Sequence, residues 1–399
     1  MKTYERREIM EKNLKMSCVV LAVLACILFA LTGESGAALR LPTATLRQLT
    51  TGSYHSDHGD WSPDGQWVVY QQQTHSRADI YKIRSDGTGA VQLTNGYYCD
   101  SKPQFSPNGK LIAFQRNTNL QGQQILDHQA SIWVMNADGS EQRQLVPPEA
   151  GQIGGAQAPF WSPDGKYIAY RYGESNKKGI WVVKADGKTP PLQVVATDFG
   201  EAPEKCMDWN PKPFSNTMAV SIRVGTRNGD HSRHIALVSF MPSSRRVRNT
   251  WLTESDPTGV NDKTCQWDMK WKNDGRTLVY TDDYNNYSDI WVMQSNGRRK
   301  VRLTDSAGNN NACYSNPNWS PNGRYIAYWS SEGFTSTSKK RIYLMTADGT
   351  RKTCLMDNEK LRQSSYSGYL LHFNNSGNAI LFNGRDISGK LQLYALDLH

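Results

Sequence analysis

Imidazole and carboxylate side chains cluster in the segment His-Ser-Asp-His-Gly-Asp, which runs from His55 to Asp60. Imidazoles together with a carboxylate suit a divalent transition metal, and an imidazole is also the commonest general base. We select four candidate metal ligands: His55, His58, Asp60 and His372. No spacing among them is diagnostic, so a cofactor is not required by the sequence, and a divalent metal (Mn or Ca) is the one candidate. The alternative interpretation is a group of solvated polar side chains that pair with one another.

Arginines and unusual aromatic residues form a second candidate set. Guanidinium groups match carboxylate and sulfate oxygens, and aromatic rings stack on sugars or anchor protein partners. Trp267 and Trp329 have no counterpart elsewhere in the sequence pattern described below. The predicted ligand-binding residues are Trp267, Trp329, Tyr284, Tyr287, Arg116, Arg171, Arg223 and Arg227. The alternatives are ordinary surface charge for the arginines and packing beneath long loops for the rings.

A repeated strand–turn–strand unit must position these side chains. Trp161-Ser162-Pro163-Asp164-Gly165 has full copies that begin at Trp61, Phe105 and Trp319, and partial copies at Trp209, Trp271 and Phe373. Ser-Pro-Asp-Gly supplies a tight turn, because Pro presets φ, Asp bonds its own backbone and Gly accepts a positive φ. The seven copies lie 44 to 62 residues apart, which is the period of a propeller blade.

Each copy is followed by an apolar run such as Ile132-Trp133-Val134-Met135, and most of these runs are followed by an Asx-Gly turn and a short element such as Leu93-Thr94. Four strands per repeat predict an all-β, seven-bladed propeller of four-stranded antiparallel blades over residues 38–399. The last repeat lacks a fourth strand, and Leu46–Thr50 has the sequence of one. We therefore expect the N-terminal strand to join the last blade and close the ring.

Variable polar residues precede the aromatic residue of each unit. In a propeller these positions lie where one blade leads into the next, so we expect them to ring one mouth of the central channel together with His58 and His372. Besides those two, they are the rest of the segment from His55 to Asp60, together with Asp100, Lys102, Glu201, Glu204, Asp208, Asp268, Lys270, Asn316 and Asn318.

Residues 1–37 resemble an export signal, with basic residues before the apolar run Cys18–Leu31 and small residues at 35–37. The alternative is an uncleaved membrane anchor, which would be the chain's only membrane contact. Removing residues 1–37 deletes five basic and four acidic side chains, so the formal charge falls from +9 to +8. A basic, exported, monomeric chain, periplasmic or extracellular, favours an acidic protein or anionic glycan and disfavours nucleic acid.

Export also permits disulfides. Cys265 and Cys313 occupy equivalent places in consecutive repeats. A bridge between them is one candidate, although connectivity does not follow from sequence.

The Trp-Ser-Pro-Asp-Gly unit, with Ile-Trp-Val-Met and Ala-Asp-Gly, resembles the TolB-like β-propeller family over residues 45–399. The resemblance implies an envelope binding or scaffold module. Seven repeats and no preceding α/β domain separate the chain from TolB itself. Similar repeats occur in oligogalacturonate lyases, which are seven-bladed and use a metal, and in peptidases that add a Gly-x-Ser-x-Gly elbow, absent here.

Two hypotheses follow. The first is a non-enzymatic binding or scaffold module for a cell-envelope protein or an anionic glycan. The alternative is a metal-assisted, oligogalacturonate-type lyase of anionic polysaccharides, in which a metal or Arg neutralises the uronate and His or Tyr takes the C5 proton. Its candidate catalytic residues are His58, His372, Arg171, Arg223 and Tyr284.

Overall fold

The computed structural model describes residues 41–74, 77–117, 130–148, 155–172, 178–196, 207–212, 215–225, 231–253, 265–284, 287–308, 312–332, 340–357 and 371–399. The chain divides into two units, Met1–Pro42 and Thr43–His399. Almost all of the first unit lies outside the described residues, so the predicted export signal stays a prediction. Among the residues that are described, no helix is long and apolar enough to cross a membrane.

The second unit is built from antiparallel strands. Four sheets contain four strands each. The first comprises β2 (His55–Trp61), β3 (Trp67–Thr74), β4 (Arg77–Arg84) and β5 (Val91–Gln92). The second comprises β6 (Cys99–Phe105), β7 (Leu111–Asn117), β8 (Ala130–Asn136) and β9 (Arg143–Val146). The third comprises β10 (Ala156–Trp161), β11 (Tyr167–Tyr172), β12 (Gly179–Lys184) and β13 (Leu192–Val195). The fourth comprises β26 (Leu371–Phe373), β27 (Ala379–Arg385), β28 (Leu391–Leu398) and β1 (Ala44–Gln48).

A 12-stranded sheet holds the remaining strands as three further antiparallel groups. These are β14 (Met207–Trp209), β15 (Thr217–Gly225), β16 (His231–Met241) and β17 (Arg246–Trp251); β18 (Cys265–Trp271), β19 (Thr277–Tyr284), β20 (Tyr287–Gln294) and β21 (Val301–Arg302); and β22 (Ala312–Trp319), β23 (Tyr325–Glu332), β24 (Lys340–Thr346) and β25 (Lys352–Asp357). Single parallel pairings, Arg233 with Cys265 and Ser288 with Cys313, join the groups.

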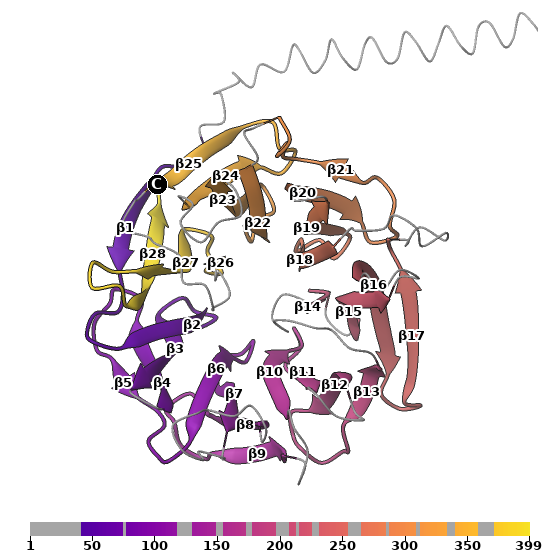
Figure 1. Cartoon of the computed structure of the whole chain (residues 1–399). Coiled ribbons are helices and arrows are strands. Elements are labelled where there is room, and N and C mark those ends of the chain that lie inside the picture. Colours follow the sequence, from indigo (N-terminus) through magenta and orange to yellow (C-terminus); the bar gives the residue numbers. More distant parts are fainter. Residues whose placement is uncertain are drawn as a thin grey trace, which may run out of the picture. The chain divides into compact units, whose positions relative to one another are not determined.

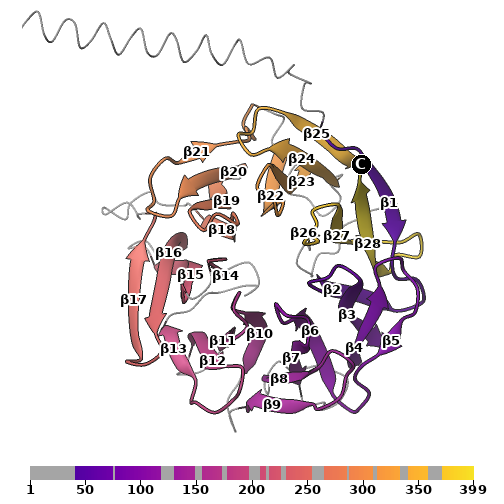
Figure 2. The same ribbon diagram turned by 180° about the vertical axis from the view of Figure 1, so that it is seen from behind.

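The groups follow one another around a common axis (Figures 1 and 2). The first strand of each group lies nearest the axis, and the last strand lies on the outside. The fold is therefore all-β and propeller-like, as the repeat predicts. The N-terminal segment lies beside the last repeat, because β1 pairs with β28 from Ala44 opposite Leu398 to Gln48 opposite Tyr394.

The Ser-Pro-Asp-Gly segments form the predicted turns. The Gly65 amide donates to the Ser62 carbonyl oxygen at 2.8 Å, and the Ser62 hydroxyl accepts from the Trp67 amide at 2.9 Å. Gly65 has a φ of 70°, which only glycine adopts without strain. The same bonds recur in the other full copies, so the sequence unit specifies one local structure.

Apolar side chains fill the space between neighbouring groups. One core cluster joins Trp61 and Val68 of the first group to Leu381 and Leu393 of the last. The glycine of each Asx-Gly turn packs in the same way on the preceding group. A Cβ on Gly297 would lie 2.6 Å from the Leu252 carbonyl oxygen, and one on Gly139 would lie 2.9 Å from the Leu93 carbonyl oxygen. The Leu-Thr element is thus an inter-group contact.

Candidate functional site

A β-bulge recurs in the innermost strands, three residues before the aromatic residue of the unit. Each bulged residue has a positive φ between 49° and 52°: His58, Lys102, Ala158, Asp268 and Asn316. The strand register shifts at each of these places. A bulge bends a strand and re-aims its side chains, so the same local distortion presents several different residue types towards the axis.

The residue immediately before the unit's aromatic residue forms a hydrogen bond to the next group. Asp60 Oδ2 accepts from the Phe105 amide at 2.8 Å, and Gln104 Oε1 accepts from the Trp161 amide at 2.8 Å. Asp208 Oδ2 accepts from the Trp271 amide at 2.7 Å. These polar side chains therefore hold neighbouring innermost strands together, and Asp60 and Gln104 also line the cavity at the axis described next.

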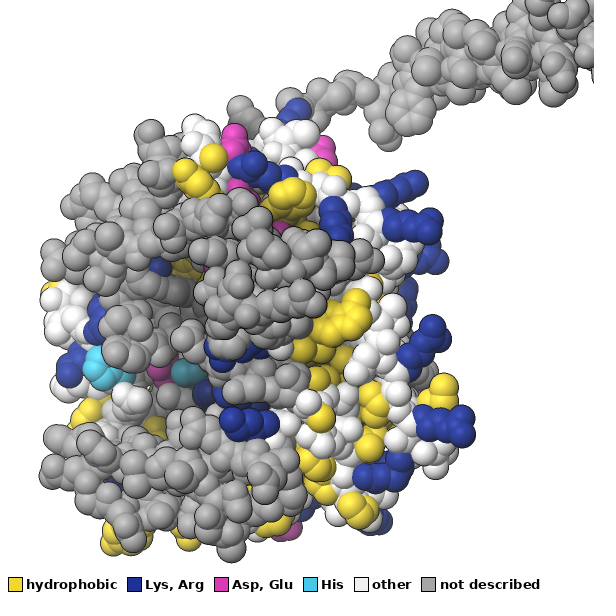
Figure 3. All heavy atoms as spheres, turned by 45° about the vertical axis from the view of Figure 1, so that its right-hand side comes forward, with side chains coloured by type: hydrophobic (Ala, Val, Ile, Leu, Met, Phe, Trp, Pro, Cys, Tyr) yellow, Lys and Arg dark blue, Asp and Glu magenta, His cyan; other side chains and the backbone are white. Residues whose placement is uncertain are grey.

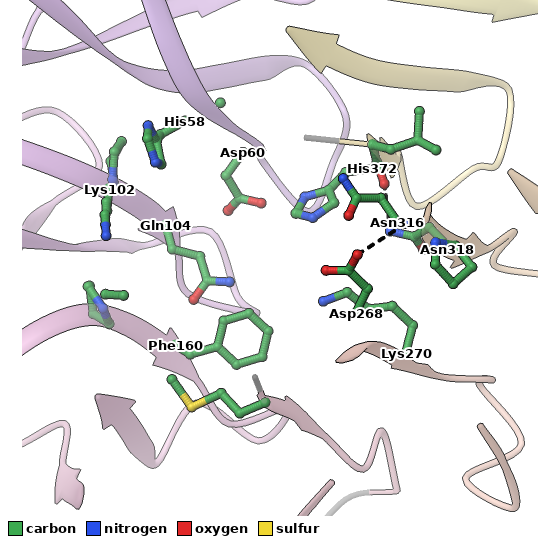
Figure 4. Close-up of a pocket in the computed structure, with 17 residues that line it drawn as sticks. His58, Asp60, Lys102, Gln104, Phe160, Asp268, Lys270, Asn316, Asn318 and His372 are labelled. Carbon is green, nitrogen blue, oxygen red and sulfur yellow. Dashed lines mark hydrogen bonds between the residues drawn. The ribbon is translucent and has the colours of Figure 1, made fainter. Parts of the chain in front are cut away.

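A cavity of about 150 Å³ lies at the axis, and we call it the axial cavity. Among the described residues, the innermost strands β2, β6, β10, β14, β18, β22 and β26 all contribute to its wall. The lining residues are His58, Gly59, Asp60, Lys102, Pro103, Gln104, Ala158, Pro159, Phe160, Met207, Asp268, Lys270, Asn316, Pro317, Asn318, Leu371 and His372. In Figure 4, Asp60, His372 and Asp268 point towards one another across the cavity, and Phe160 and Lys270 lie below them.

Burial shifts the pKa values of two titratable groups in the axial cavity. It raises the pKa of Asp60 to about 7, against the opposing effects of the amides of Phe105 and Trp61 and of the charge on Lys270. Burial, and then Lys270, lowers the pKa of His372 to about 3, so the imidazole is neutral at physiological pH. An acid with a pKa near neutrality beside a neutral imidazole is an arrangement typical of functional sites.

Lys270 carries the positive charge in this part of the wall. Its Nζ lies 3.3 Å from Asp208 Oδ1 and 5.4 Å from the centre of the Phe160 ring. Burial raises the pKa of Asp208, and Lys270 opposes that rise. The cavity therefore combines cations, amides, the carboxyl groups of Asp60 and Asp268, of which Asp60 titrates near pH 7, and one aromatic face.

Known proteins share this architecture. A model described as the TolB β-propeller domain matches residues 37–202. An uncharacterized protein of Agrobacterium fabrum is 31% identical over 250 residues, which span 60% of this chain and 73% of that protein. The chain belongs to the TolB-like β-propeller family.

Solved structures share the fold of this TolB-like propeller. An oligogalacturonate lyase from Vibrio parahaemolyticus has a TM-score of 0.61 and 12% identity, covering 90% of this chain and 98% of that one. An oligogalacturonate lyase in complex with manganese has a TM-score of 0.60 and 13% identity, covering 90% and 97%. The β-propeller domain of the Trilobed protease from Pyrococcus furiosus has a TM-score of 0.57 and 9% identity, covering 87% and 94%. At these identities the likeness is one of fold.

The TolB-like propeller brings together three of the four predicted metal ligands. His58, Asp60 and His372 line the axial cavity, but His55 does not, because its Nδ1 accepts from the Leu391 amide at 3.0 Å. Its selection as a ligand is wrong. Among the described residues no group of three His, Cys, Asp or Glu side chains could hold a metal ion. The residues present do not fit the predicted metal, and we derive no step through one.

Among the predicted ligand-binding aromatic residues, the selection of Trp329 is wrong. Trp329 is only 4% exposed and packs edge-to-face on Phe382, with ring centres 6.1 Å apart. Trp267 is half-buried in β18, and Tyr287 is exposed at the start of β20. The side chain of Tyr284 lies outside the described residues.

The three predicted ligand-binding arginines that the structure describes do not line the axial cavity. Arg116 is buried and forms two hydrogen bonds of 2.7 Å to the Asp100 carboxylate. Its guanidinium also lies 4.5 Å from the centre of the Trp133 ring, so Arg116 is structural and its selection is wrong. Arg171 in β11 and Arg223 in β15 are half-buried and do not line the cavity. Arg227 lies outside the described residues.

None of the described cysteines, Cys99, Cys265, Cys313 and Cys354, forms a disulfide in the structure. The disulfide considered between Cys265 and Cys313 is therefore absent. Each of the two lies instead at one of the parallel pairings between groups, Cys265 opposite Arg233 and Cys313 opposite Ser288. Burial raises the pKa of the Cys313 thiol to about 11, which suits a packing role.

Sequence analysis missed Gln104, Phe160 and Met207 as members of the site. Gln104 and Phe160 stand immediately before the unit's aromatic residue, at the position that Asp60 and His372 occupy in their own repeats. Aligning the seven repeats on that aromatic residue would have found both. Met207 stands two residues before Trp209, and its repeat is a partial copy in which that alignment is weaker.

Proposed function

We propose that this TolB-like propeller is an exported binding module that takes a carboxylate-bearing group of its ligand into the axial cavity. The ligand is an anionic glycan or an acidic cell-envelope protein, and the uronate or acidic side chain enters the mouth. The observation that carries the proposal is the convergence of Lys102 and Lys270 on one cavity with the amides Gln104, Asn316 and Asn318. Ammonium and amide donors are the groups that bind carboxylate oxygens.

The titration of Asp60 supports an anionic ligand. At neutral pH a carboxyl group with a pKa of about 7 is about half protonated, so it opposes an incoming anion less than an ordinary aspartate does. A bound carboxylate would favour the protonated form further, because like charges raise each other's pKa. Binding is therefore expected to take up a proton and to be tighter at pH 6 than at pH 8.

The supporting architecture is a seven-bladed propeller over residues 38–399, closed into a ring by β1 in the last blade. The pairing of β1 with β28 and the wall formed by seven innermost strands support this arrangement. Residues 1–37 are proposed to be a cleaved signal peptide, and the mature chain a periplasmic or extracellular monomer. N-terminal sequencing and light scattering of the exported protein test these two points directly.

The test of binding uses the chain from residue 38 and saturated trigalacturonate as the probe in titration calorimetry. Lys102→Asn is the informative variant, because asparagine tolerates the positive φ at this position while losing the charge. Lys110→Asn, at an exposed turn, is the matched control. Weaker binding in Lys102→Asn alone, together with tighter binding at pH 6, supports the proposal. Equal binding by both variants would show that the ligand does not bind in the axial cavity.

A lyase is the second candidate, and one specific observation favours it. The partly protonated Asp60 has a pKa suited to acid–base chemistry near pH 7, and the unprotonated imidazole of His372, which can accept a proton, faces the same cavity (Figure 4). In a β-elimination, His372 would take the C5 proton of a uronate. The electrons of that bond would form the C4–C5 double bond, the C4–O bond would break, and Asp60 would protonate the leaving oxygen.

Absorbance of the unsaturated product, followed with polygalacturonate, decides between the two candidates. Product from the wild-type chain that disappears in His372→Asn favours the lyase. Assays with and without EDTA then ask whether a metal takes part. Binding of trigalacturonate with no product in either condition leaves the binding module as the function.

A further inference from the structure

The outer edge of the fourth group is exposed and basic. Eleven consecutive residues, from Met241 to Trp251, are exposed to solvent. They include Arg245, Arg246 and Arg248 and no acidic residue. Among the described outermost strands, β5 and β21 have two residues, β9 and β13 have four, and β25 ends in Asp357. The strand β25 also has six residues and β1 has five, but both are partly buried, so β17 differs from them in that every one of its residues is exposed.

One side of β17 has no described strand beside it. β17 pairs antiparallel with β16 only, from Arg246 opposite Met241 to Trp251 opposite Ala236. Backbone amide and carbonyl groups on the far side of such an edge are available to another extended chain. Natural proteins keep such edges short or shielded, and an edge strand of six exposed residues departs from that pattern.

The side chains of β17 alternate in character between its two faces. Arg246 and Arg248 project to one face, and Val247 and Trp251 project to the other, because residues two apart share a face of a strand. Val247 is 36% exposed and Trp251 is 49% exposed. A chain that pairs with this edge would meet cations on one face and apolar surface on the other.

Positive charge continues from β17 onto the next group. The turn between β20 and β21 packs against Leu252, directly after β17, through Gly297. Arg298, Arg299 and Lys300 follow that glycine and are exposed. In Figure 3 the Lys and Arg side chains stand along this outer side, with hydrophobic side chains between them. We call β17 and these three residues the basic edge.

We propose that the basic edge docks an acidic, extended segment of a partner protein, which adds a strand to β17. Acidic residues at alternate positions would face Arg246 and Arg248, and apolar residues between them would cover Val247 and Trp251. A second copy of this chain would present the same arginines, so like charges disfavour pairing of two β17 strands. This inference does not depend on the axial cavity, because the two sites use the outermost and the innermost strands.

The probe is a labelled peptide of about eight alternating glutamates and valines, a common strand length. Fluorescence anisotropy measures its binding to the chain from residue 38. Arg246→Glu with Arg248→Glu should weaken binding by about tenfold or more, because each exposed pair becomes a repulsion. Lys110→Glu with Lys188→Glu, two exposed lysines on other groups, is the matched control and should leave binding nearly unchanged.

Two changes in the peptide separate strand addition from simple charge attraction. Four glutamates followed by four valines keep the composition and remove the alternation, and should bind at least about tenfold more weakly. Methylation of the backbone amides, on the valines in one peptide and on the glutamates in another, removes alternate donors, and at least one of the two should lose binding.

Equal binding of all these peptides would overturn the inference, because charge alone would then suffice. Binding of the chain to vesicles containing phosphatidylglycerol, without binding of the alternating peptide, would also overturn it and assign the basic edge to a membrane surface. Intact binding of trigalacturonate by the Arg246→Glu, Arg248→Glu variant would show that the axial cavity is unaffected.

Discussion

The indole nitrogen of Trp61 lies 3.2 Å from the backbone carbonyl oxygen of His372 and donates a hydrogen bond to it across 311 residues of sequence. The same bond joins Trp161 to Gln104, Trp209 to Phe160 and Trp271 to Asp208. The tryptophan of the repeated unit therefore has two tasks: its ring fills the space between groups, and its N–H ties each innermost strand to the one before.

Replacing Trp61 by phenylalanine should destabilise the fold by about 1–3 kcal/mol, because the ring is retained while the His372 carbonyl loses its donor. Trp319 is the matched control. It is equally buried at the equivalent position, but its indole nitrogen has no hydrogen-bond partner among the described residues. Urea unfolding should therefore show a larger loss for Trp61→Phe than for Trp319→Phe. Equal losses would mean that the hydrogen bond contributes nothing.

Asp60 should make stability fall as the pH rises. Its pKa is about 7 in the folded chain and near its ordinary value of 3.8 when unfolded, so between these values the folded state binds more protons. The stability present below pH 4 is therefore lost as the pH rises through about 7, by at most about 1.4 kcal/mol per unit. Asp60→Asn removes this dependence, and its stability relative to wild type should rise between pH 5 and pH 8.

Asp64 provides the opposite sign for comparison. Its hydrogen bond with Ser62 holds the pKa of this turn carboxyl below its ordinary value, despite a small opposing effect of burial. Its contribution is present above the unfolded pKa and is lost as the pH falls. The difference in stability between Asp64→Asn and the wild type should accordingly narrow only as the pH falls. The same direction of change for both variants would contradict the assignment.

Ala158 occupies a bulge with a φ of 49°, where any residue other than glycine is strained. Ala158→Gly should stabilise the fold by up to about 1 kcal/mol, and Ala158→Val should destabilise it by about 2 kcal/mol, because a β-branched side chain fits this conformation worst. Ala169→Gly, in the regular strand β11, should instead cost about 1 kcal/mol. Opposite signs for the two Ala→Gly changes, measured by thermal unfolding, identify the bulge.

Gly297 and Gly165 separate backbone strain from crowding between groups. Both have a positive φ, 76° and 69°. A Cβ would lie 2.6 Å from the Leu252 carbonyl oxygen at Gly297, but 3.7 Å from Pro107 Cδ at Gly165. Gly165→Ala should cost about 1–2 kcal/mol from conformation alone. Gly297→Ala should cost about 1–3 kcal/mol more because the backbone must move. Similar unfolding midpoints would argue that the turn can shift freely.

Much of the fold follows from local chemistry that sequence displays. Ser62, Pro63, Asp64 and Gly65 each have a defined role in one turn, so the repeat predicts strand, turn and strand without knowledge of the partner groups. The position of Leu46–Thr50 beside the last repeat also follows, because its apolar pattern completes a four-stranded group. The strand itself begins two residues earlier, at Ala44, where its pairing with β28 begins.

The site was harder to predict because it depends on contacts between groups. His58, Asp60 and His372 meet because their positions relative to the unit's aromatic residue bring them to the axis, and the repeat carries that information. The burial of Trp329 depends on Phe382, and the pairing of Arg116 depends on Asp100 and a neighbouring strand. No pattern within one repeat distinguishes an aromatic residue that packs on a neighbouring side chain from one that is exposed and can bind a ligand.

The order of synthesis has a consequence for β1. This strand emerges from the ribosome first, and its partner β28 emerges about 350 residues later, the sequence separation of the Arg47–Asp397 ion pair. Bringing such distant segments together carries a chain-entropy term of roughly 5 kcal/mol, from (3/2)RT ln n. Until β28 has been made, β1 must stay unpaired, because pairing with any other strand would be incorrect. Of the strands that the structure describes, the first to be translated thus pairs with the last, so the four-stranded sheet of the last group can be completed only after β28 has been made.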